Sequence, residues 1–364
     1  MNGGHRHRWL LAAFLVLLLP ACAIRVPRSV HVTILGASGT IEGALFLPEG
    51  AGPHPALVLL HDTGLDGRHE YLQEARFFAS CGVAALAYDK RGTGGSAGDR
   101  DLSNFDFLAH DAVAAVEFLR RRPGIDSTRV GVWGRGQGGW IAPMAAAVDS
   151  EIAFVLLVSA PVVSPLDQLA YQRAEELIAG GGLARSDAEA IVRLRKRIWE
   201  FWLDPPGTGT AASDSLRLAF EKARKRPWYS RAVERGDLPE SLIPDEAMGS
   251  ENHPARAWLP DDMAVFWSLD HDPAWALERV SAPILALYGE EDRVIPTTKS
   301  VTALRAAVWR SRIKRHRAVA HVFPSADHTI HVKSGSGLFA RVEPAPGYRD
   351  SVTNWLKRVA GAKG

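Results

Sequence analysis

The sequence contains few cysteines and has almost no net charge. Its 364 residues include only two cysteines, Cys22 and Cys81, which excludes a small fold held together by disulfides. The 43 Lys and Arg residues nearly balance the 41 Asp and Glu residues. Because no basic cluster stands out, we expect no nucleic-acid partner. The remaining composition, with 46% hydrophobic residues, is that of a globular chain long enough to bury a sizeable core.

Long apolar runs are also missing, and the one near the beginning is short. Trp9–Leu19 holds eleven apolar residues, whereas a helix needs about 20 to span a bilayer. The run follows Arg6 and Arg8, as the apolar segment of a signal peptide follows its basic region. We therefore expect residues 1–21 to be a targeting segment that is not part of the fold.

The end of this segment indicates a lipid anchor. Leu19-Pro20-Ala21-Cys22 resembles a bacterial lipobox, in which the chain is cut before the cysteine and the thiol is lipidated. An ordinary secretory signal and an uncleaved anchor are the alternatives. Ala23 follows the cysteine, which favours the outer membrane. The expected location is the bacterial cell envelope, anchored by lipid at Cys22 on the periplasmic side of the outer membrane.

The rest of the chain alternates short apolar runs with helical patterns. Val30–Leu35 and Thr40–Leu47 alternate apolar and polar residues, which predicts an antiparallel hairpin. Six continuous apolar runs follow, each bounded by turn residues as buried parallel strands are: Ala56–Leu60, Val83–Tyr88, Val130–Trp133, Ile152–Val158, Ile284–Tyr288 and Ala318–Phe323. Helical patterns lie between them. The alternation predicts an α/β fold, with a mostly parallel sheet covered by helices on both faces.

Residues 165–275 interrupt this alternation. They carry helical patterns and no convincing strand, so we expect an inserted helical cap. Residues 22–29 are then a linker, and residues 30–164 and 276–364 are the two parts of the core. The tryptophans of the insertion either line an apolar substrate pocket or pack the cap onto the sheet: Trp199, Trp202, Trp228, Trp258, Trp267 and Trp275.

One turn has the pattern of a nucleophile elbow. The apolar run that ends at Trp133 is followed by Gly134-Arg135-Gly136-Gln137-Gly138 and then by a helical pattern. A strand, a sharp turn with glycines two residues before and after its centre, and a helix form this elbow in hydrolases. The centre is normally a serine that the strained turn exposes above the sheet. In this chain the centre, the nucleophile position, is Gly136.

The partners that such an elbow needs follow in the expected order. Asp292 and then His328 each follow an apolar run, where the acid would fix the imidazole and the imidazole would act as general base. His331 is a rival base further from its strand. The main-chain N–H groups of Thr63 and Gln137 are the expected oxyanion donors. The alternative interpretation of Asp292 is a solvated loop carboxylate, and that of His328 is a buried structural histidine.

On these residues the chain from about Val30 to Ala360 resembles the α/β-hydrolase family, in particular esterases and dienelactone-hydrolase-like members with a helical cap. Tyr88–Ser96 resembles the family's D-x-R-G-x-G-x-S loop, which is mainly structural. The resemblance implies the α/β-hydrolase fold, hydrolysis of carboxylic esters (or thioesters or amides), a small acyl ester or related apolar compound as ligand, and no cofactor. No metal is expected, because the histidine spacing matches no ligand signature.

Gly136 departs from the family pattern because glycine lacks the side-chain oxygen that would carry the acyl group. Three interpretations remain: a non-catalytic ligand- or partner-binding pseudoenzyme, hydrolysis by a water that His328 activates, and an inactivated variant of a serine hydrolase. Ser159 follows another strand but lacks an elbow. The sequence predicts weak or absent hydrolysis, and it predicts that Gly136→Ser would create or raise esterase activity.

Overall fold

The computed structural model describes residues 28–36, 39–64, 67–100, 103–180, 182–203, 210–238, 268–313, 317–335 and 341–362. The expected signal peptide and its lipidation site, Cys22, lie outside the described residues. Cys81 is buried and free. Within the described residues, no helix is both long and apolar enough to cross a membrane.

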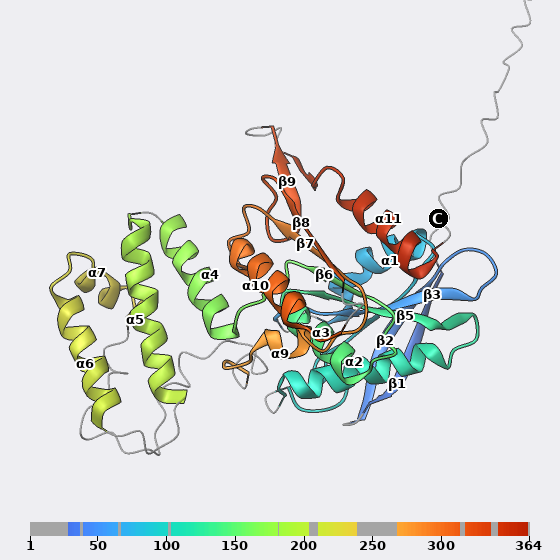
Figure 1. Ribbon diagram of the computed structural model, residues 1–364, viewed down its shortest axis with the longest axis horizontal. Helices are drawn as coiled ribbons and strands as arrows, with labels where there is room; N and C mark the ends of the chain where they lie inside the picture. Colours follow the sequence, from blue (N-terminus) through green and yellow to red (C-terminus); the bar gives the residue numbers. More distant parts are fainter. Residues whose placement is uncertain are drawn as a thin grey trace, which may run out of the picture.

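An eight-stranded sheet forms the centre of the fold, in the order β1-β2-β4-β3-β5-β6-β7-β8 (Figure 1). β1 pairs antiparallel with β2, and β2 pairs antiparallel with β4, whereas every other neighbouring pair is parallel. The strands are β1 (Arg28–Gly36), β2 (Gly39–Leu47), β3 (His54–Leu60), β4 (Ala84–Tyr88), β5 (Ile125–Arg135), β6 (Val155–Val158), β7 (Ile284–Gly289) and β8 (Ala318–Phe323). This topology confirms the predicted fold class.

Helices cover both faces of the sheet, which is why its central strands are continuous apolar runs. One hydrophobic cluster joins a face of the sheet to α2 (Phe105–Arg120), α3 (Gly138–Val148), α9 (Pro273–Leu277) and α10 (Thr297–Arg310). A second cluster joins the other face to α1 (Leu72–Ser80), which follows the short helix η1 (Arg68–Tyr71), and to α11 (Tyr348–Ala360). The core therefore lies in two layers, one on each side of the sheet.

Three features differ most from the expected strands. β6 begins at Val155, three residues after the start of the predicted run at Ile152. β5 begins at Ile125, five residues before the predicted run, because His54 pairs with Ile125 ahead of a register shift that the polar residues 126–129 fill. A separate hairpin of β9 (His331–Ser334) and β10 (Arg341–Pro344) was not predicted. Its four-residue strands are too short to show a reliable alternation of apolar and polar residues.

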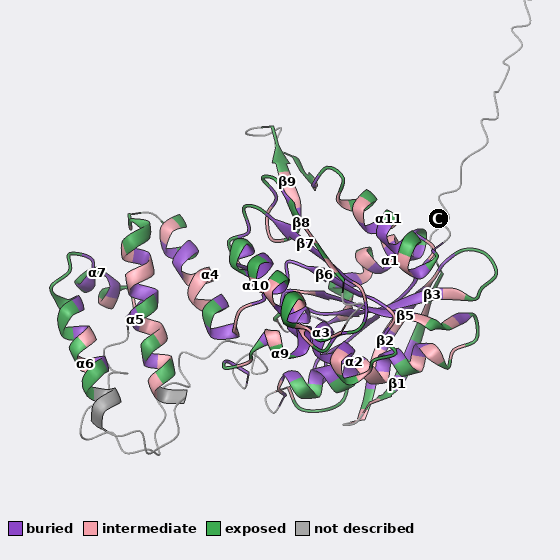
Figure 2. Cartoon of the chain, viewed as in Figure 1, coloured by how far each residue is buried: buried purple, intermediate pink, exposed green. Residues whose placement is uncertain are grey.

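The helices α4 (Pro165–Ala179), α5 (Arg185–Leu203), α6 (Thr210–Arg224) and α7 (Tyr229–Glu234) form a bundle beside the sheet (Figure 1). We call these four helices the insertion bundle. It has a hydrophobic cluster of its own, which includes Trp228, and Figure 2 shows buried positions along α4 and α5. Trp275 on α9 is 46% exposed. The side chains of Trp202, Trp258 and Trp267 lie outside the described residues.

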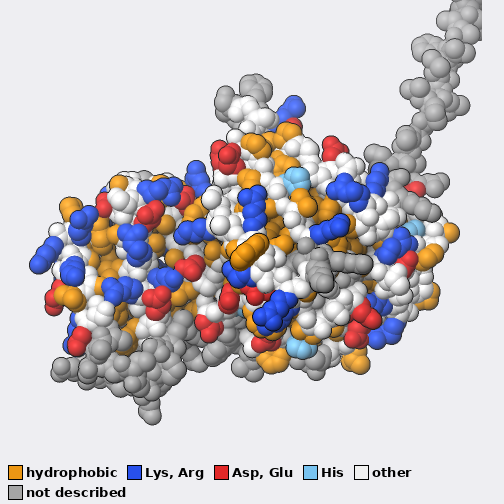
Figure 3. All heavy atoms as spheres, in the orientation of Figure 1, with side chains coloured by type: hydrophobic (Ala, Val, Ile, Leu, Met, Phe, Trp, Pro, Cys, Tyr) orange, Lys and Arg blue, Asp and Glu red, His pale blue; other side chains and the backbone are white. Residues whose placement is uncertain are grey.

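The surface of the insertion bundle carries charges of both signs. Figure 3 shows Lys and Arg side chains interspersed with Asp and Glu over these helices. Several of them pair, among them Arg173 with Glu176 at 2.9 Å and Lys196 with Asp167 at 2.5 Å. Mixed and paired charges are typical of a solvated helix face.

Candidate active site

The turn between β5 and α3 is held tightly against the end of β3. A Cβ atom on Gly134 would lie 2.0 Å from the carbonyl oxygen of Gly138, and one on Gly138 would lie 2.4 Å from that of Leu60. Gly136 has φ +51°, in the left-handed region that favours glycine. The turn therefore has the elbow geometry that the glycine spacing predicts, and it lies beside the loop that follows β3.

Asp292 and His328 lie together at the carboxyl ends of β7 and β8. Asp292 Oδ2 lies 2.9 Å from His328 Nδ1. The other carboxylate oxygen of Asp292 accepts hydrogen bonds from the N–H groups of Val294 and Ile295, both at 2.8 Å, and the residue is only 2% exposed. The carbonyl oxygen of His328 accepts a hydrogen bond from Ser159 Oγ at 2.7 Å. Both partners are thus fixed in position.

The second ring nitrogen of His328 faces a carboxylate that the motifs did not single out. His328 Nε2 lies 3.2 Å from Asp62 Oδ2. Asp62 Oδ1 accepts hydrogen bonds from the main-chain N–H groups of Thr63, at 2.7 Å, and of Gln137, at 3.0 Å. The two N–H groups that the sequence proposes as oxyanion donors therefore converge on one oxygen atom, and that oxygen belongs to Asp62.

Asp62 also fills the space in which a side chain at position 136 would begin. A Cβ atom on Gly136 would lie 1.8 Å from Asp62 Oδ1, far inside any allowed contact. A side chain at position 136 and the observed conformation of Asp62 therefore exclude each other. The expectation that Gly136→Ser alone would raise esterase activity needs correction, because the new side chain would first have to displace Asp62.

Further hydrogen bonds hold the loop that carries Asp62 in position. The N–H group of Asp62 donates to Tyr71 Oη at 2.9 Å. Lys90 Nζ donates to the carbonyl oxygen of Asp62 at 3.1 Å and to Gln137 Oε1 at 3.0 Å. Lys90 is only 7% exposed, so its bonds form away from bulk solvent. Lys90 thereby ties the loop after β3 to the elbow.

The charge state of the site follows from its two carboxylates. Burial alone would lower the pKa of His328, but the hydrogen bonds from its ring to Asp292 and Asp62 outweigh burial and raise the pKa to about 9. Burial would raise the pKa of Asp62, but its bond with His328 lowers it below the usual value. At neutral pH the site therefore holds an imidazolium between two carboxylates. His328 is then a proton donor, and it becomes a base only after losing a proton.

Other candidate residues lie apart from this arrangement. His331 Nδ1 bonds to the carbonyl oxygen of Thr329 at 2.9 Å, so the structure does not join it to Asp292. Burial, with a further contribution from Lys90, lowers the pKa of His61 to about 3, and its ring stacks on Tyr71. In the described part of the chain, no three His, Cys, Asp or Glu residues are grouped so as to hold a metal ion.

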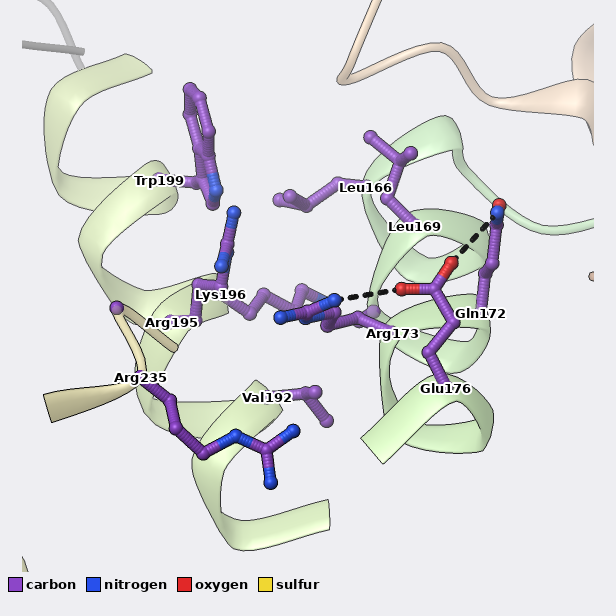
Figure 4. Close-up of a pocket in the computed structure, with 12 residues that line it drawn as sticks. Leu166, Leu169, Gln172, Arg173, Glu176, Val192, Arg195, Lys196, Trp199 and Arg235 are labelled. Carbon is purple, nitrogen blue, oxygen red and sulfur yellow. Dashed lines mark hydrogen bonds and ion pairs between the residues drawn. The ribbon is translucent and has the colours of Figure 1, made fainter. Parts of the chain in front are cut away.

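A separate cavity of about 470 Å³ lies inside the insertion bundle, between α4 and α5 (Figure 4). Its walls combine apolar side chains, such as Leu169 and Trp199, with charged ones, such as Arg195 and Lys196. The close-up also shows Arg173 bonded to Glu176 along α4, at one wall of the cavity. Neither His328 nor Asp62 lines this cavity, so it is distinct from the site described above.

Comparisons with known proteins agree with the fold. A profile described as the alpha/beta hydrolase family matches residues 57–342. Esterase EstD of Thermotoga maritima is 28% identical over 313 residues, which are 83% of this chain and 60% of the esterase. An uncharacterized 31.7 kDa protein of Escherichia coli is 23% identical over 252 residues, covering 69% of this chain and 77% of that protein.

Solved structures show the same fold at lower sequence identity. The structure of DcsB in complex with its substrate analogue aligns with a TM-score of 0.54 and 18% identity, over 92% of this chain and 100% of that one. The Pyrococcus furiosus esterase Pf2001 aligns with a TM-score of 0.51 and 16% identity, over 92% of this chain and 94% of that one. The family profile covers most of the chain, which confirms the resemblance drawn from the motifs. This protein belongs to the α/β-hydrolase family.

Proposed function

We propose that this protein hydrolyses carboxylic esters, or the related thioesters or amides, and that its activity is low because Asp62 occupies the oxyanion donors. The observation that carries the proposal is the convergence of four groups on one point. The Asp292–His328 pair approaches from one side, and the N–H groups of Thr63 and Gln137 approach from the other. A serine-independent hydrolysis needs these groups and a water molecule.

The mechanism requires Asp62 to turn away from the two N–H groups. Without Asp62 beside it, His328 loses a stabilising bond to its protonated form, so its pKa falls and it can act as a base. His328 then takes a proton from a water molecule that attacks the ester carbonyl. The resulting oxyanion lies on the N–H groups of Thr63 and Gln137. When the intermediate collapses, His328 returns the proton to the leaving alcohol.

The expected rate is modest. When the nucleophile or base of a serine protease is removed, the oxyanion hole and substrate binding still leave a residual acceleration of about 10³–10⁴ over water. The esterase named among the relatives supports the choice of ester bonds, and we propose a small acyl ester as the ligand class. We further propose that no cofactor takes part.

The test is hydrolysis of p-nitrophenyl acetate and p-nitrophenyl butyrate by the natural sequence and three variants. We expect slow turnover by the natural sequence, faster turnover by Asp62→Gly, which frees both N–H groups, and no turnover by His328→Ala. The variant His331→Ala is the matched control and should resemble the natural sequence. Absence of turnover above buffer in both the natural sequence and a folded Asp62→Gly variant would contradict the proposal.

A second candidate function is non-catalytic ligand or partner binding. The observation that favours it is the filled donor pair, since Asp62 Oδ1 already accepts both N–H groups. In that case the natural sequence and Asp62→Gly would both lack turnover with the two esters. A folded His328→Ala variant would then hydrolyse them no more slowly than the natural sequence.

We also propose the cellular context that the sequence predicts. Residues 1–21 would be removed, and a lipid on Cys22 would anchor the protein in the outer membrane, on the periplasmic side of the cell envelope. Residues 165–275 would form a cap between the two parts of the core. Mass spectrometry of the mature protein should find a diacylated or triacylated Cys22. A mature N-terminus at another residue, without lipid, would refute the anchor.

A further inference from the structure

We infer that the cavity inside the insertion bundle binds an alkyl carboxylate, which is an amphiphile with one apolar chain and one terminal negative charge. The described residues that line the cavity come from α4, from α5, and from Arg235 and Gly236 directly after α7. Its volume of about 470 Å³ lies within the range of cavities that enclose small organic ligands. This binding goes beyond ester hydrolysis and does not depend on it.

One end of the cavity is apolar. Figure 4 shows Leu166 and Leu169 of α4 opposite Trp199 of α5 at this end. Leu166 belongs to the hydrophobic cluster on one face of the sheet, and the other two side chains pack against that cluster. An alkyl chain placed between these side chains would leave water for an apolar environment, which is favourable.

The rest of the cavity is basic. Figure 4 shows Arg173 and Arg195 in the middle of the cavity and Arg235 at the end opposite Trp199. A guanidinium group offers parallel N–H donors that match the two oxygens of a carboxylate. The apolar end and the basic remainder together fit a molecule with a chain at one end and a carboxylate at the other.

The charges around the cavity favour a ligand with one negative charge. Arg173 pairs with Glu176 at 2.9 Å and also with Asp237. Arg235 Nε lies 3.4 Å from Asp237 Oδ2. The charges of the same two carboxylates act on Arg195. Three arginines therefore share two carboxylates, and one more negative charge would balance them.

Burial increases the need for that charge. Burial, and after it the charge of Arg173, lower the pKa of Arg195 below its usual value, so its protonated form lacks full compensation. Lys196 adds no further excess, because it pairs with Asp167 at 2.5 Å and with Glu200 at 3.6 Å. A carboxylate beside Arg195 would supply the missing charge, whereas a phosphate dianion would exceed it.

Isothermal titration calorimetry with sodium octanoate tests the site in the natural sequence. We expect octanoate to bind roughly tenfold more tightly than hexanoate, because two more methylene groups leave water. 1-Octanol, which has no charge, and octyl phosphate should both bind more weakly than octanoate. Equal binding of 1-octanol, tighter binding of octyl phosphate, or no binding of octanoate to the folded protein would overturn the inference.

Substitutions on α5 test which residue holds the carboxylate. Arg195→Gln should weaken octanoate binding at least about tenfold, as the loss of a charge-assisted hydrogen bond does. Arg195→Lys keeps the charge without the guanidinium fork and should give an intermediate loss. Arg193→Gln is the matched control, since the Arg193 side chain is 65% exposed and does not line the cavity. Circular dichroism establishes that each variant is folded, and an equal loss in Arg193→Gln would contradict the assignment.

Two further measurements separate this cavity from the site that contains His328, which is also a cation. His328→Ala should retain octanoate binding although it loses ester hydrolysis. An octanoic acid with a diazirine at the far end of its chain should label peptides that contain Leu169 or Trp199. Loss of octanoate binding in folded His328→Ala, or labelling of the peptide that contains Asp62, would overturn the inference.

The outcomes for the two sites are independent. Failure of ester hydrolysis alone would leave the carboxylate site in place, and failure of octanoate binding alone would leave the proposed hydrolysis in place.

Discussion

At the scale of residues, positions 62 and 136 compete for one volume. Asp62 Oδ1 lies only 1.8 Å from the position that a Cβ atom on residue 136 would take. Glycine at 136 therefore does two things: it adopts the left-handed backbone of the turn, and it leaves room for a side chain that comes from the loop after β3. The identity of residue 136 is meaningful only together with that of residue 62.

We predict that a serine at position 136 becomes active only when Asp62 is also replaced. Gly136→Ser alone should destabilise the protein and give no gain in p-nitrophenyl acetate hydrolysis, because the introduced side chain would overlap Asp62. The double variant Asp62→Gly, Gly136→Ser frees the space and the oxyanion donors. We expect it to exceed Asp62→Gly alone by on the order of 10²-fold, since a placed nucleophile contributes at least that much. Labelling by a fluorophosphonate probe should appear only in the double variant.

Failure of the folded double variant to gain activity, or labelling of Gly136→Ser alone, would show that position 62 does not control the elbow. Asp62→Gly is the control, since it removes the carboxylate without adding a nucleophile.

Also at this scale, the imidazolium of His328 predicts a dependence of stability on pH. The pKa of His328 is raised from 6.5 to about 9 in the folded protein, so its protonation stabilises the fold fully below about pH 6.5. This contribution, up to about 3 kcal/mol, is lost as the pH rises from 6.5 to 9. Urea unfolding of the natural sequence and of Asp62→Asn across this range should show a smaller loss in the variant. A His328 ring that titrates near pH 6.5 by NMR would contradict the prediction.

At the scale of elements, α4 supports the loop that carries the acid. Tyr171 Oη donates to the carbonyl oxygen of Asp292 at 2.8 Å, and Gln168 Nε2 donates to that of Val294 at 2.9 Å. The first helix of the insertion bundle is thereby bonded to the loop after β7. These bonds couple the placement of the Asp292–His328 pair to α4.

We predict that Tyr171→Phe destabilises the protein by about 1 kcal/mol, the usual net contribution of one hydrogen bond. The variant keeps the ring and loses only the donor to Asp292. Urea unfolding measures the change, and Gln172→Ala is the control, because the Gln172 amide bonds to Gln168 and Glu176 within the same helix. A loss of stability in Gln172→Ala as large as that in Tyr171→Phe would contradict a particular role for the bond from Tyr171 to the loop that carries Asp292.

The helices, strands and loops also show how much of the fold and of the site could be predicted from one sequence. The sheet could be predicted because buried parallel strands are recognisable as apolar runs between turn residues, and the elbow because its glycines are required by backbone contacts. Asp292 and His328 could be proposed from their order along the chain. Asp62 could not, because its role arises from contact between two loops that are far apart in the sequence. Its place directly after a strand was the available signal, since ligands bind at the carboxyl ends of parallel strands.

At the scale of the whole molecule, the buried hydrophobic residues that the structure describes form three main clusters. Two lie on the faces of the sheet, and the third lies within the insertion bundle. A unit with its own cluster can open while the rest of the fold stays closed. We predict that amides of α5 and α6 exchange with deuterium at least roughly tenfold faster than those of β3 and β5. Equal protection of α5 and β5 would mean that the molecule opens as one unit.

The close contact between the end of β3 and the elbow has a consequence for related chains. Because a Cβ atom on Gly138 would lie 2.4 Å from the carbonyl oxygen of Leu60, two segments distant in sequence present side chains to the same small volume. A side chain from either segment can fill that volume, but side chains from both cannot. Chains dismissed as inactive because the usual position holds glycine can be re-examined by asking what the neighbouring loop contributes instead.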